Sequence, residues 1–71
     1  MELTEAKDKY EGRLIENKAT GATFKAWKVV RLYFHAPEPI EALLCRPDGR
    51  LTMHHEPCRV SLSELEKNWS T

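Results

Sequence analysis

The fold is decided by the stretch from Thr23 to Phe34, which reads TFKAWKVVRLYF. Most of its residues are β-branched or aromatic, which is the composition typical of β-strands. No other segment of the chain has so high a density of strand-forming residues. Because the stretch is long for a single strand, a bulge or bend is expected within it. The sequence therefore predicts a central strand on which the rest of the domain is built.

Side chains of a strand alternate between its two faces, and this alternation divides the stretch into two sets. One set is almost entirely apolar and is expected to face the core: Phe24, Ala26, Lys28, Val30, Leu32 and Phe34. The other set contains Lys25, Trp27, Val29, Arg31 and Tyr33. Because it interleaves two cations with two aromatic rings, the second face is predicted to be a binding surface formed by Lys25, Trp27, Arg31 and Tyr33.

The segments on either side of this stretch have the composition of shorter strands joined by turns. Further strands are expected at 13–17, 40–46, 50–55 and 58–60. Gly21 follows polar residues and is free to adopt a positive φ angle in a turn. The Pro47-Asp48-Gly49 sequence is typical of a tight turn, so residues 50–55 are predicted to return as the partner strand of a hairpin.

Both ends of the chain differ from this pattern. Residues 1–11 are highly charged and are expected to form an N-terminal arm or a short helix, before a single β domain at 12–71. Near the C-terminus, Ser61 and Ser63 each precede a glutamate by three residues, which matches the capping box of a helix. Leu62, Leu65 and Trp69 would lie on one face of that helix, which is expected to cover an open end of the sheet.

Four or five short strands followed by a helical turn predict a mainly β fold, either a small curled sheet or a barrel. In the spacing of its strands, the segment from about residue 10 to residue 69 resembles the SH3-like small barrels, the group that includes Tudor and KOW modules. The resemblance lies in strand spacing and includes no family motif. It implies a barrel of four or five strands with a short C-terminal helix, and fold alone implies no function.

Length and charge restrict the classes of function. A chain of 71 residues forms one domain with a small core, and its 11 basic residues are balanced by 11 acidic ones. Zero net charge argues against non-specific nucleic-acid binding and favours self-association. No stretch is apolar enough to span a membrane, and the first residues do not form a secretory signal. A cytoplasmic protein with reduced cysteines is therefore expected.

Residues that would support catalysis or metal binding are sparse. Cys45, His54 and Cys58 are the candidate metal ligands, but their spacing contains no Cys-x-x-Cys pair, and whether they converge in space is left open. Ser61 and Ser63 are explained as helix caps, and a core this small leaves little room for a pocket that encloses a substrate. The sequence therefore predicts no enzyme, no catalytic residue, no metal, no cofactor and no small-molecule substrate.

The leading hypothesis is a non-enzymatic interaction module, an adaptor or regulator that binds either another protein or a second copy of itself. The alternative is RNA or single-stranded nucleic acid, whose bases would stack on Trp27 and Tyr33 while Lys25 and Arg31 contact phosphates. A third interpretation gives the face no binding role, with Trp27 and Tyr33 packed beneath the C-terminal helix.

Overall fold

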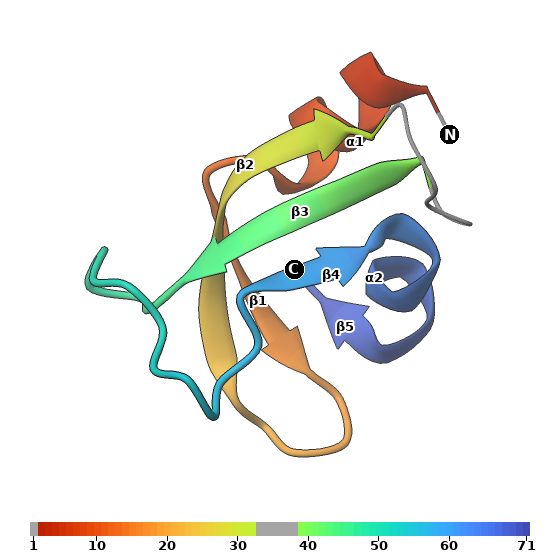
Figure 1. The fold of residues 1–71 in the computed structure, drawn as a ribbon. Coiled ribbons are helices and arrows are strands. Elements are labelled where there is room, and N and C mark those ends of the chain that lie inside the picture. The colour runs from red at the N-terminus through yellow and green to blue at the C-terminus, as the bar shows by residue number, and fades with distance from the viewer. Residues whose placement is uncertain (1, 33–38) are drawn as a thin grey trace.

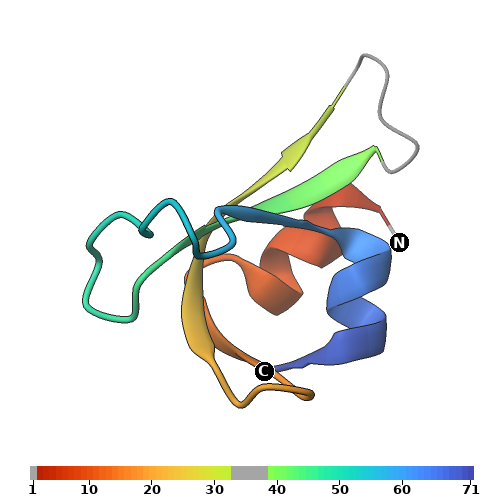
Figure 2. The same cartoon turned by 60° about the horizontal axis from the view of Figure 1, so that its bottom comes forward.

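The computed structural model describes residues 2–32 and 39–71 and shows a mainly β fold (Figure 1). Five antiparallel strands form one sheet in the order β4-β3-β2-β1-β5. The strands are β1 (Arg13–Asn17), β2 (Thr23–Arg31), β3 (Ile40–Cys45), β4 (Arg59–Ser61) and β5 (Trp69–Ser70), and the helices are α1 (Leu3–Tyr10) and α2 (Leu62–Asn68). The sheet curls into a half-barrel, with both helices on its concave side (Figure 2). The predicted class, a curled β sheet with a short C-terminal helix, is confirmed.

Helix α2 connects the two outer strands of the sheet. It follows β4 directly and leads directly into β5, which lies at the opposite edge. Its N-cap is Ser61, whose hydroxyl oxygen accepts a hydrogen bond from the Glu64 amide at 3.3 Å, so Ser61 rather than Ser63 is the serine that caps the helix. Leu62, Leu65 and Trp69 are buried in the core, as predicted, but only the two leucines lie on the helix, because α2 ends at Asn68 and Trp69 begins β5.

Helix α1 belongs to the same hydrophobic core as the sheet. It packs against β1 and β2, and its Ala6 and Tyr10 side chains are almost completely buried. The sequence left open whether this segment is an arm or a helix, and the structure shows a helix over Leu3–Tyr10. The small side chain of Ala6 supplies a further contact, because it lets the helix approach the sheet closely.

The predicted strand at residues 50–55 does not form. The Pro47-Asp48-Gly49 turn is present, with the Gly49 amide donating to the Arg46 carbonyl at 2.8 Å and Gly49 at a φ of 90°. The chain then leaves the sheet and returns at Cys58, whose carbonyl accepts from the Leu44 amide at 2.8 Å. Strand β4 is therefore the partner of β3, and residues 46–58 form an excursion that is named here the 46–58 loop.

Strand β2 contains the expected bulge, and its position overturns part of the predicted alternation. Ala26 lies opposite Leu44 and Lys28 lies opposite Leu43, so Trp27 is the extra residue. Phe24 and Ala26 are buried as predicted, but beyond the bulge Val29 is buried, Val30 is half-buried and Lys28 is exposed. The prediction that Val30 faces the core and Val29 faces solvent is wrong, because one inserted residue reverses the two faces downstream.

A glutamate side chain satisfies the backbone of β2 just beyond this bulge. Strand β1 begins at Arg13, opposite Ala26, so the part of β2 beyond Ala26 has no strand paired on that side. There the Glu11 carboxylate accepts hydrogen bonds from the Val29 amide at 2.8 Å and from the Lys7 ammonium at 3.2 Å. The Val29 hydrogen bond, with a smaller contribution from Lys7, holds the pKa of Glu11 below its usual value.

We expect Glu11→Ala to lower the melting temperature, and Glu11→Gln to lower it less, because the amide oxygen of glutamine still accepts from Val29. A folded-state pKa below the unfolded value stabilises the protein above the unfolded pKa, and this stabilisation is lost as pH falls through the folded value. Thermal unfolding between about pH 7 and about pH 3 should therefore show a weaker acid dependence for Glu11→Ala than for the unmodified chain. Glu66→Gln, exposed on α2, is the control. Identical pH dependence in Glu11→Ala and the unmodified chain would contradict the assignment.

The two tryptophans should fluoresce differently, since Trp27 is 47% exposed and Trp69 is 6% exposed. We expect Trp69→Phe, which retains Trp27, to emit at long wavelength and to be quenched strongly by acrylamide. Trp27→Phe should emit at shorter wavelength and resist quenching until guanidinium chloride unfolds it. Circular dichroism establishes that both variants are folded. If Trp69→Phe, whose only tryptophan is Trp27, emitted at short wavelength and resisted acrylamide, the indole of Trp27 would lie in the interior.

Candidate interaction surface

The two faces of the sheet differ in what covers them. Both helices lie on the concave face, and within the described residues the convex face carries no helix (Figure 2). Four large apolar side chains are exposed in the described part of the chain: Leu14 (53%), Trp27 (47%), Leu51 (85%) and Met53 (52%). Leu14 and Trp27 come from β1 and β2 and face away from the core, and the other two come from the 46–58 loop. An apolar surface of this kind is typical of interaction sites.

Two hollows lie on either side of Trp27. The larger has a volume of about 540 Å³ and is lined by Trp27, Leu43, Leu44, Leu51, Thr52, Cys58 and Arg59. The smaller has a volume of about 360 Å³ and is lined by Lys25, Trp27, Cys45, Gly49 and Leu51. Trp27 and Leu51 line both hollows, so these two side chains form a shared wall between them. The site is therefore a wide apolar depression between the sheet and the 46–58 loop, divided near its middle.

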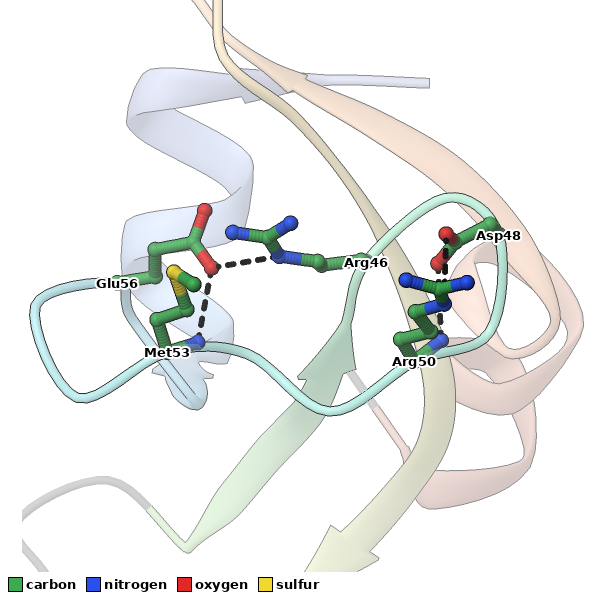
Figure 3. A network of polar contacts seen from close by, with 5 residues as sticks. All are labelled: Arg46, Asp48, Arg50, Met53 and Glu56. Atoms are coloured by element: carbon green, nitrogen blue, oxygen red, sulfur yellow. Dashed lines mark hydrogen bonds and ion pairs between the residues drawn. The ribbon is translucent and has the colours of Figure 1, made fainter.

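A carboxylate in the 46–58 loop holds the far side of this site in place. One oxygen of Glu56 accepts from the Met53 amide at 2.8 Å and from the Arg46 guanidinium at 3.0 Å (Figure 3). The Met53 hydrogen bond is the larger cause, and Arg46 the smaller one, of a Glu56 pKa below its usual value. These two contacts connect the end of β3 to the returning part of the loop.

A second acidic side chain organises the turn at the start of the loop. The Asp48 carboxylate accepts from the Arg50 amide at 3.0 Å, and its other oxygen lies 3.5 Å from the Arg50 guanidinium (Figure 3). Both side chains are largely exposed, so the ion pair adds little stability. The amide hydrogen bond is the structural contribution, because it sets the backbone direction just before Leu51.

The charged groups that line the two hollows are all basic. Lys25 lines the smaller hollow and Arg59 the larger, and no carboxylate lines either one. Arg59 lies 3.9 Å from a Glu41 carboxylate oxygen, which is too long for a hydrogen bond, and its side chain is 65% exposed. Within residues 2–32 and 39–71, Lys25 makes no ion pair. Lys28 is also exposed on β2 and helps to lower the pKa of Glu11.

The four residues predicted to form the binding surface do not share one face in the structure. Lys25 and Trp27 lie together beside the smaller hollow. The bulge places Arg31 on the same side of β2 as the buried Val29, away from Trp27. Tyr33 lies outside the described residues. Of the predicted grouping, the structure therefore brings together Lys25 and Trp27 and separates Arg31 from them.

The sequence reasoning missed the contributions of other segments to the site. Leu51 comes from the 46–58 loop, Leu43 from β3 and Arg59 from β4. No contiguous motif connects them, because they meet only through the order of the sheet. One signal of the loop's contribution was available in the sequence, because Leu51 and Met53 are apolar residues in a segment bounded by turn residues. Their alternation with polar residues instead made this segment resemble a strand.

The candidate metal ligands do not gather in the structure. No group of three or more potential ligands from His, Cys, Asp and Glu occurs in the described part of the chain. Cys45 is buried beside the smaller hollow, and Cys58 is exposed beside the larger one, both as free thiols. His54 and His55 contact each other edge to face, with ring centroids 5.5 Å apart.

No helix among residues 2–32 and 39–71 combines the length and the apolar character that crossing a membrane requires. No protein-family model matches the chain, and no curated protein and no solved structure is significantly similar to it.

Proposed function

We propose that this domain is a non-enzymatic interaction module that binds a protein partner through the convex face around Trp27. The observation that carries the proposal is the Trp27–Leu51 wall with an apolar hollow on each side. Tryptophan is among the residues most enriched at the energetic centres of protein interfaces. An indole that is 47% exposed beside a leucine that is 85% exposed gives a partner substantial apolar surface to cover.

The architecture supports this proposal in two ways. The helices already fill the concave side, so the convex side is the sheet face open to a partner. The strand order β4-β3-β2-β1-β5, with helix α2 between β4 and β5 in the chain, also supports an SH3-like barrel as the finer fold class. A small adaptor or regulator in the cytoplasm remains the role we propose for such a module.

Single-stranded nucleic acid is the second candidate, and one observation favours it. Lys25 and Arg59 line the hollows on either side of Trp27 without any carboxylate in the lining. A base could stack on the indole while the cations contact phosphates. Against this candidate, Arg31 lies on the other face of β2, which removes one of the predicted phosphate contacts. The protein partner is therefore the proposal we favour.

We expect Trp27→Ala and Leu51→Ala each to abolish capture of the same proteins from nuclease-treated extract of the native cell, measured by quantitative mass spectrometry. Met53→Ala is the matched control, because Met53 is an exposed apolar residue of the same loop that lines neither hollow. Leu51 is largely exposed and Met53 is about half exposed, so these two substitutions should change the free energy of unfolding by less than about 1 kcal/mol. Trp27 is 47% exposed, so circular dichroism establishes that Trp27→Ala is folded. A captured protein is then purified and its direct binding to the four chains is compared.

The outcomes separate the candidate partners. Equal capture by the unmodified chain, Trp27→Ala and Leu51→Ala would show that the partner binds elsewhere. Capture from untreated extract that is lost after nuclease treatment, together with oligonucleotide binding that weakens steeply with salt, would favour the second candidate. Dimers of the unmodified chain in sedimentation velocity that dissociate in Leu51→Ala would identify a second copy as the partner.

A further inference from the structure

Charge distinguishes the two hollows from the rest of a neutral molecule. The chain carries 11 basic and 11 acidic residues, yet the lining of the hollows contains Lys25 and Arg59 and no acid. A third depression, beside Trp69, is lined instead by His55 and Glu56, with no lysine or arginine. The local positive charge is therefore a property of this site and not of every concave part of the surface.

Both cations are available to a ligand. Lys25 has no carboxylate partner within the described residues, and Arg59 is held only by a long contact to Glu41. Arg46, which is nearby in the sequence, is different, because its guanidinium is already bonded to Glu56. A carboxylate that approaches either hollow would therefore find a cation that is not already neutralised at hydrogen-bond distance.

We propose that the partner binds through an acidic segment that places one apolar side chain in each hollow. This inference rests on the proposed function and specifies the chemistry of its partner. The two apolar side chains would lie on opposite sides of the Trp27–Leu51 wall, which explains why both residues line both hollows. Asp or Glu residues beside them accept hydrogen bonds from Lys25 and Arg59, the latter through the paired N–H groups of its guanidinium.

The contributions of the two kinds of contact differ. Covering the indole and Leu51 removes apolar surface from water and supplies most of the affinity. The half-buried Lys25 and the exposed Arg59 add attraction that salt screens, with a Debye length of about 10 Å at 0.1 M. They also select the partner, because a basic segment with the same apolar residues would place like charges beside Lys25 and Arg59.

The test is a selection of random peptides displayed on phage, with the unmodified chain as bait and Trp27→Ala for counter-selection. We expect enriched peptides to carry two large apolar residues with Asp or Glu beside them. One enriched peptide is synthesised with a fluorophore, and its affinity is measured by anisotropy. Lys25→Glu, Arg59→Ala and Leu51→Ala should each weaken binding by about tenfold, and added salt should weaken it for the unmodified chain.

Two controls make the test specific. Lys18→Glu reverses an exposed charge in the β1–β2 turn, outside both hollows, and should leave the affinity within about twofold. A second peptide, in which every Asp and Glu is replaced by Lys, should bind Lys25→Glu more tightly than it binds the unmodified chain. This reversal requires that the peptide bind near the charge at position 25, because a general loss of structure cannot strengthen binding.

Three results would overturn the inference. Enriched peptides that need Trp27 but show no preference for Asp and Glu would leave the protein-binding function in place and remove the acidic partner. If the selection yielded no peptide that depends on Trp27, the proposal of an acidic partner segment would be overturned. The capture experiment above would still decide whether the domain binds a protein. Tighter binding of a fluorescent oligothymidylate than of any enriched peptide, lost in Lys25→Glu, would identify nucleic acid as the ligand of this site.

Discussion

The extra residue that β2 carries at Trp27 determines which side chains of the sheet reach the core and which reach solvent. Upstream of the bulge, Phe24 and Ala26 face the helices, and downstream of it Val29 does so. If Trp27 were paired regularly instead of bulged, the alternation would continue unbroken, so Val29 would face solvent and Lys28 would face the core. Burying the Lys28 ammonium without a partner would cost far more free energy than the local loss of one ladder position.

The same irregularity connects the framework to the surface. Lys28 and Trp27 can both lie outside the core because the bulge relieves strict alternation at this point, so β2 carries two consecutive exposed side chains in its middle. The position of α1 also depends on the part of β2 beyond the bulge. The Glu11 carboxylate, at the end of α1, accepts a hydrogen bond from the Val29 amide, where β2 is no longer paired with β1. The docking of α1, the packing of Val29 and the exposed position of Trp27 therefore all depend on the same part of β2, at and just beyond the bulge.

The elements that the sequence predicted correctly are those specified by neighbouring residues. The Ser61 cap, the Gly49 turn and the strand at Arg13–Asn17 each depend on local chemistry, and each is present. The strand at 50–55 failed because a distant contact competes with it. Glu56 binds Arg46, ten residues earlier in the chain, and also binds the Met53 amide, so this segment folds back on itself instead of pairing with β3. Nothing in the local pattern of residues 50–55 contains that information.

The candidate site was predicted in part for the same reason. Lys25 and Trp27 are two residues apart on one strand, so alternation was enough to place them together. The position of the bulge was not predictable, because no glycine or proline marks it within the run KAWKVV. Leu51 reaches Trp27 through a loop that is held by carboxylates at Asp48 and Glu56, and its position depends on hydrogen bonds to backbone amides. The rigid sheet thus supplies the indole and the polar loop supplies the opposing wall, so changes in the loop would alter the shape of the hollows while leaving the core that supports Trp27 intact.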